Sequence, residues 1–69
     1  MAIDRSLEYK ILNALLDIAS ALLNIQNAIA AEKIKDDKLY RESINQSGAD
    51  INSLIKTTKE IMEILKENG

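Results

Sequence analysis

The sequence contains no cysteine, no histidine and no proline. Without cysteine, the chain has no disulfide to reinforce it, although small domains often depend on one. Zinc, haem and copper sites use histidine or cysteine as ligands, so we expect no metal or cofactor site. The commonest catalytic base and the best nucleophile are missing too, so we assign no catalytic residue and expect no enzymatic activity.

Glycine and aromatic residues are scarce, with two glycines, two tyrosines, and neither phenylalanine nor tryptophan. This composition excludes a turn-rich β fold. Hydrophobic residues make up 46% of the chain, and leucine, isoleucine and alanine supply most of them. We therefore predict an all-α protein with a single small domain over residues 1–69. A core of this size provides little stability alone, which favours oligomerisation.

The net charge of −2 argues against broad electrostatic capture of nucleic acid. The densest basic patch alternates with an equal number of acidic residues, so its charges sum to zero; it comprises Lys33, Lys35, Lys38 and Arg41 among Glu32, Asp36, Asp37 and Glu42. Nucleic acid is therefore an unlikely partner. The opening residues MAIDRS lack the basic segment and apolar run of a signal peptide, so we expect a cytoplasmic protein.

Residues 11–31 carry one charged side chain, Asp17. Six large aliphatic residues recur there at alternating spacings of four and three, which is the heptad pattern of a packed helix. This pattern predicts a core seam made of Ile11, Leu15, Ile18, Leu22, Ile25 and Ile29.

The apolar surface of this helix extends well beyond the seam. Its arc is wider than the roughly 100° stripe of an ordinary surface helix, so one neighbouring helix is not enough to cover it. We predict a self-association or partner face that comprises Leu12, Leu16, Ala19 and Leu23 together with a column of alanines at every seventh position, Ala14, Ala21 and Ala28. A membrane span is not expected, because Asn13, Asp17, Asn24, Gln26 and Asn27 would be costly in lipid.

The seam is interrupted between about residues 32 and 37, where its register would place acidic residues inside. Asp36 or Asp37 is suited to cap a second helix, as Asp4 or Ser6 is suited to cap the first. From residue 40 the spacing of four and three resumes, which predicts a second core seam of Tyr40, Ile44, Ile51, Leu54, Ile61 and Leu65, with Ser47 and Thr58 at its two polar positions.

Gly48 leaves two folds open. The second seam stays in phase through it, which favours one helix over residues 37–67 and another over residues 4–33, each about 45 Å long. Such matched arms predict an antiparallel helical hairpin that self-associates into a four-helix bundle. The tetrapeptide Ser47-Gly48-Ala49-Asp50 also resembles a helix stop and restart, which predicts a three-helix bundle instead.

The matched arms, heptad seams and alanine column resemble the helix layout of the family of the plasmid copy-number regulator Rop, but no motif of that family's RNA-binding face maps onto these residues. From the residues themselves we predict a non-catalytic interaction module: an adaptor, assembly or small regulatory protein. It would act through homo-oligomerisation, as a homodimer or larger, and could bind one further protein partner. The alternative is a nucleic-acid-binding regulator built as a small dimeric hairpin.

Overall fold

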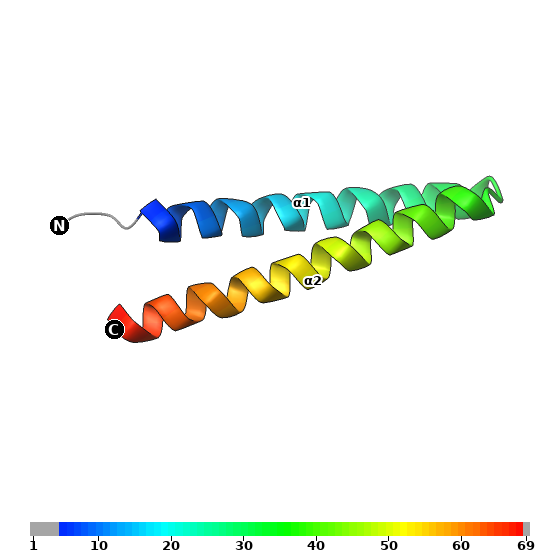
Figure 1. The fold of residues 1–69 in the computed structure, drawn as a ribbon. Helices are drawn as coiled ribbons and strands as arrows, with labels where there is room; N and C mark the ends of the chain where they lie inside the picture. The colour runs from blue at the N-terminus through cyan, green and yellow to red at the C-terminus, as the bar shows by residue number, and fades with distance from the viewer. Residues whose placement is uncertain (1–4, 69) are drawn as a thin grey trace.

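The computed structural model describes residues 5–68, which form two helices packed against each other in an antiparallel hairpin (Figure 1). Helix α1 spans Arg5–Lys33 and helix α2 spans Asp37–Asn68. The predicted all-α hairpin is therefore confirmed, and its helix boundaries were predicted to within one residue.

The start of α1 settles one of the two predicted caps. The chain is already helical at Arg5, so Ser6 lies inside the first turn and is not the residue that precedes the helix. Asp4, the other predicted cap, lies outside the described residues. No glycine or proline interrupts the 29 residues of α1, in keeping with their high helix propensity.

The turn between the helices closes with a pair of backbone hydrogen bonds characteristic of a Schellman motif. The Asp36 N–H donates to the carbonyl of Ala31 at 2.9 Å, and the Lys35 N–H donates to the carbonyl of Glu32 at 3.2 Å. Lys35 adopts the left-handed conformation that this motif requires, with φ of 58°. Lysine here does what glycine does in most such turns, which is why the sequence showed no glycine signal for the turn.

Asp36 then begins α2 as its N-cap. Its side-chain Oδ1 accepts a hydrogen bond from the Leu39 N–H at 3.0 Å, and its carbonyl accepts the first helical hydrogen bond from Tyr40 at 3.0 Å. Of the two caps that the sequence allowed, the structure selects Asp36 and places Asp37 in the first helical turn.

We expect Asp36→Ala to lower the free energy of unfolding by about 1 kcal/mol, because the Leu39 N–H loses its partner. Asp37→Ala is the matched control and is expected to cost less, since it removes only a favourable charge near the helix N-terminus. Urea unfolding of both variants provides the comparison. Equal losses of stability would contradict the assignment of Asp36 as the cap.

Helix α2 continues through Gly48, which has a helical conformation with negative φ. The alternative of a three-helix bundle with a break at this residue is therefore wrong. The phase of the apolar residues was the better guide, because a preserved register requires an unbroken helix, whereas a single glycine only lowers helix stability by about 1 kcal/mol.

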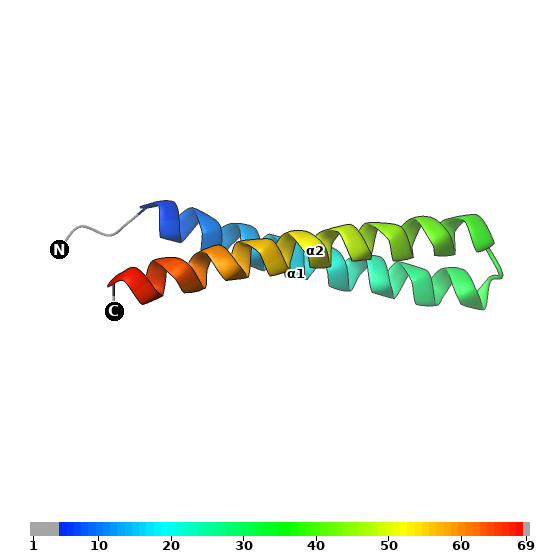
Figure 2. The same cartoon turned by 60° about the horizontal axis from the view of Figure 1, so that its bottom comes forward.

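The two helices cross at an angle. They overlap in one view (Figure 2) and separate toward the chain termini in another (Figure 1). The hairpin is long and thin, 53 × 16 × 13 Å, with a radius of gyration of 15.8 Å against about 11 Å for a compact domain of this length. It exposes 5629 Å² of surface, whereas a compact 7.7 kDa protein exposes about 4,300 Å². The single chain thus leaves much of its surface uncovered.

Candidate self-association face

The contact between the two helices is made by the alanine column of α1. Ala21, Ala28 and Ala31 are the buried hydrophobic residues of the described chain, and Ala28 and Ala31 are 2% and 0% exposed. Ala14 continues the same column and is half-buried. The sequence analysis placed Ala14, Ala21 and Ala28 on the self-association face; the structure instead places them inside the hairpin, where small side chains let the helices approach closely.

Small residues face this column from α2. Ser43, Ser47 and Asp50 are buried in the half of the hairpin nearest the turn. Farther along, the same stripe of α2 continues with larger, half-buried residues, namely Leu54, Thr57, Ile61 and Ile64. Since the distance between packed helices depends on the side chains between them, this gradient in size accounts for the separation of the helices toward the termini.

A polar cluster centred on Asp50 joins the helices near their middle. The Ser20 hydroxyl donates to Asp50 Oδ2 at 2.6 Å, and Asn24 Nδ2 donates to the same oxygen at 3.2 Å. From within α2, Gln46 Nε2 donates to Asp50 Oδ1 at 3.1 Å. Asp50 is 8% exposed, so these bonds replace the water that its carboxylate has lost. The cluster fixes the register of the two helices.

Sequence reasoning missed this cluster, because Ser20 and Asn24 fall outside the predicted seam and Asp50 was interpreted as part of a helix stop and restart. The signal that was available is positional. Ser43, Ser47 and Asp50 form their own stripe at spacings of four and three, and Asn24 shares a stripe with Ala31. A charged residue among small ones on a helix stripe indicates a buried, hydrogen-bonded carboxylate.

Hydrogen bonds hold the pKa of Asp50 below its ordinary value; the bond from Ser20 contributes most, burial opposes it, and the bonds from Gln46 and Asn24 add to it. A carboxyl group with a lowered pKa in the folded state adds stability above the unfolded pKa of about 3.9, and this stability is lost as pH falls through the lower folded pKa. We expect the free energy of unfolding to decrease between about pH 4 and the folded pKa.

Asp50→Asn should reduce this decrease in the free energy of unfolding at acid pH, because asparagine has the same size as aspartate but does not titrate. Urea unfolding across a pH series measures the effect. Glu63→Gln, at an exposed position of α2, serves as the control and should leave the slope unchanged. If the free energy of unfolding falls equally steeply at acid pH in Asp50→Asn and in the unmodified protein, the titration of Asp50 is not coupled to folding.

A second polar contact lies nearer the open end, where Lys10 Nζ and Glu60 Oε2 form a salt bridge of 2.6 Å. The hydrogen bond from Lys10, and then its positive charge, lower the pKa of the Glu60 carboxyl. Both side chains are partly exposed, so the pair marks position more than it adds stability. Together with the bond from Ser20 to Asp50, it shows that residues whose numbers add up to 70 lie at the same level of the hairpin.

Most residues of the predicted core seams are exposed within the single chain. All six seam residues of α1 are exposed, from 37% for Ile25 to 62% for Leu22. On α2 the exposed seam residues are Tyr40, Ile44, Ile51 and Leu65, whereas Leu54 and Ile61 are half-buried between the helices. The seams do not form the core of one hairpin.

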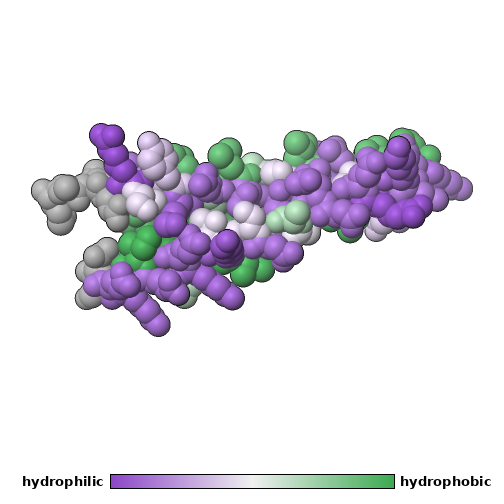
Figure 3. All heavy atoms as spheres, in the orientation of Figure 1, coloured by the Kyte–Doolittle hydropathy of each residue, from purple (hydrophilic) through white to green (hydrophobic). Residues whose placement is uncertain are grey.

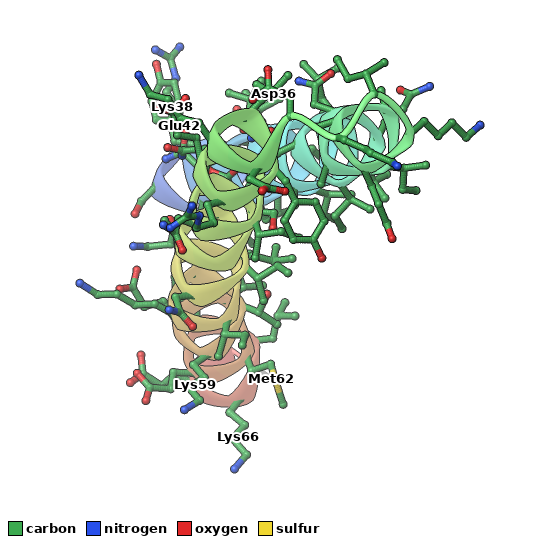
Figure 4. All side chains as sticks on the ribbon, turned by 90° about the vertical axis from the view of Figure 1, so that its right-hand side faces the viewer. Asp36, Lys38, Glu42, Lys59, Met62 and Lys66 are labelled. Carbon is green, nitrogen blue, oxygen red and sulfur yellow. The ribbon has the colours of Figure 1, made fainter. Side chains whose placement is uncertain are left out.

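The two exposed seams lie on the same side of the hairpin. On each helix the seam follows the stripe that contacts the other helix in the same rotational sense, and in an antiparallel pair equal senses turn both seams to one face. The polar contacts from Ser20, Gln46, Lys10 and Glu60 occupy the other side. The end-on view agrees: Lys38, Glu42 and Lys59 point to one side of α2, and Met62 points to the other (Figure 4). We call this apolar side the seam face.

A further apolar strip lies on the outside of α1, away from α2. Its large residues Tyr9, Leu12, Leu16 and Leu23 are exposed, Leu16 at 66%, and Ala19 is exposed among them. Hydrophobic residues are visible along this edge of α1 (Figure 3). We call these five residues the outer strip. By length and composition α1 could cross a membrane, a property that it shares with the core helices of soluble proteins and with signal sequences.

The turn carries the mixed charges found in the sequence. A shallow surface hollow there is lined by Glu32, Lys35, Asp37 and Tyr40, so two acidic groups and one basic group line it. Tyr40 is partly exposed beside them. With more acidic than basic groups, the hollow provides no concentrated positive charge for a phosphate backbone.

Comparisons of the chain with protein-family models, with curated proteins and with solved structures find no match.

Proposed function

We propose that this protein is a non-catalytic helical interaction module that acts through self-association, with two hairpins packed seam face to seam face in a four-helix bundle. The observation that carries the proposal is the exposure of the whole α1 seam and of four residues of the α2 seam, in a chain whose buried hydrophobic residues, within the part described, are three alanines. Such a core provides little of the apolar burial that folding requires.

The size of the seam face fits a second hairpin. A face of 53 by 16 Å covers roughly 850 Å², close to the 800 Å² that each partner contributes to a protein interface of ordinary size. A continuous face of exposed aliphatic residues is a liability for a free monomer and normally marks an interaction site.

A second copy is the occupant that the sequence favours. No charged residue lies in the seam of α1 between Ile11 and Ile29, so nothing in it selects a partner of opposite charge. Both seams keep the same heptad spacing over similar lengths, so the face is complementary to a copy of itself in the way that bundle helices are.

The outer strip stays outside such a bundle, because it lies on the far side of α1 from both α2 and the seam face. Its residues also follow spacings of three and four, from Tyr9 through Leu12, Leu16 and Ala19 to Leu23. We assign it to contact with an amphipathic helix of one further protein, in the helix-in-groove manner. With this contact the protein would work as an adaptor or assembly factor in the cytoplasm.

The stability of the protein should depend on its concentration, because folding and association are coupled. We expect the midpoint of thermal unfolding to fall by about 5 °C for each tenfold dilution, given the unfolding entropy of a dimer of this size. Circular dichroism melts over a hundredfold range of concentration measure this. A midpoint that does not change with dilution would contradict the proposal.

A further inference from the structure

We propose that the two hairpins pair with their turns at the same end of the bundle, and that Leu22 of each copy packs over Gly48 of the other. This inference rests on the self-association proposed above and specifies its geometry. It rests on two observations: the fixed levels of residues along the hairpin, and the charges at the ends of the seam face.

Two arrangements bring one seam face against another with two-fold symmetry. In one, the turns lie at the same end, and α1 of each copy packs against α2 of the other. In the other, the turns lie at opposite ends, and each helix packs against its own copy. Neighbouring helices are antiparallel in both, so backbone direction does not choose between them.

Gly48 distinguishes the two arrangements by its position. It lies one position beyond Ser47, on the side of α2 where the seam face continues. A Cβ atom added to it would meet nothing within 4 Å, so nothing in its own chain requires a glycine there. With the turns at the same end, residues whose numbers add up to 70 are again level, and Leu22, 62% exposed, stands opposite this gap.

The neighbouring levels fit as well. Seven residues from Gly48 along α2, Ile55 is level with Leu15 of the other copy, so two exposed aliphatic side chains meet. At one level a large side chain faces a glycine, and at the next level two aliphatic side chains meet. This is the shape complementarity that helix packing uses.

The charges at the ends of the face favour the same arrangement. Glu8 and Glu32 continue the α1 seam at its two ends, seven residues before Leu15 and seven after Ile25. With turns at opposite ends, Glu8 of one copy comes close to the level of Glu32 of the other, and symmetry repeats this repulsive pair. With turns at the same end, Glu8 is instead level with Met62 of the second copy, so this repulsion is absent.

Distances between spin labels test the arrangement directly, and the absence of native cysteine makes single-site labelling clean. We would label Ile34→Cys, at the exposed turn, and Lys66→Cys, near the open end, and measure the distance between the labels of each dimer by double electron–electron resonance. We expect like labels to lie within about 30 Å, given helix spacings of 8–10 Å. In mixed dimers of the two variants, the labels should lie near the 53 Å hairpin length.

The reverse pattern, with like labels far apart and mixed labels close, would overturn the inference while leaving self-association intact. A mass of 7.7 kDa for the labelled protein would instead show that the proposed dimer itself is wrong. The two failures are therefore distinguishable in one set of samples.

A paired substitution tests the contact of Leu22 with Gly48. Gly48→Leu should weaken the dimer at least tenfold, although leucine is the better helix former within a single chain. Leu22→Ala should also weaken it, and the double variant should recover most of the affinity, because the large side chain has moved across the interface. Asn52→Ala, at an exposed position of α2, is the control and should leave the dissociation constant unchanged. Tighter dimerisation of Gly48→Leu alone would contradict the contact.

Discussion

Ile18→Asp should abolish the dimer at working concentrations and unfold most of the chain. Ile18 lies in the middle of the α1 seam and is 40% exposed in the single hairpin. In the bundle it loses this exposure, so the substitution removes apolar burial and places a carboxylate among aliphatic side chains. At about 3 kcal/mol for each copy, the dissociation constant rises by about four orders of magnitude. Sedimentation equilibrium and helical circular dichroism measure both effects.

Leu16→Asp is the matched control for this experiment. Leu16 is more exposed than Ile18 in the hairpin, at 66%, and both are large aliphatic residues of the same helix. It lies on the outer strip, so the account predicts unchanged mass and melting behaviour with a loss of binding only to a further protein. Dissociation by Leu16→Asp with retention of the dimer by Ile18→Asp would place the self-association face on the outer strip.

Ala28→Leu should cost about 1–3 kcal/mol and push the helices apart at the turn end. Ala28 is 2% exposed and stands between the two helices near the level of Ser43. A leucine there has no room unless the backbones move or the side chain leaves its preferred rotamer. The added apolar surface does not compensate, because the site is already closed. Urea unfolding of the variant at fixed protein concentration gives the change in stability.

Ala30→Leu provides the comparison, two residues away on the exposed side of α1. Leucine and alanine both favour helix, so this change should alter stability by less than about 0.5 kcal/mol. An equal, small effect at both positions would mean that the alanine column is not enclosed within the hairpin.

The hairpin itself was predictable from local rules. The heptad spacing established two helices, the shift of register near residue 34 located the turn, and Asp36 was one of two expected caps. The sequence around Gly48 gave conflicting signals. The periodicity was the correct guide, because it extends from Tyr40 to Leu65, whereas the glycine affects only one helical turn. These are properties of single elements, which the sequence encodes densely.

The assignment of faces was not predictable in the same way. On α1 the apolar arc spans several stripes, and the heptad spacing of the large aliphatic residues selected the isoleucine and leucine stripe as the core seam. The structure uses the alanine stripe there, because small residues on both helices allow close approach and because Asp50 finds its hydrogen-bond partners only in that register. Pairwise complementarity of this kind involves two helices at once and is invisible in the pattern of either.

Self-association is tested most directly by the absolute mass of the protein in solution, measured by light scattering on a sizing column over a dilution series. We expect a mass of about 15 kDa, twice the 7.7 kDa of one chain, with dissociation at high dilution accompanied by loss of helix. A folded 7.7 kDa monomer that melts cooperatively at every concentration would contradict it, and would mean that the hairpin is stable with its seam face open to water.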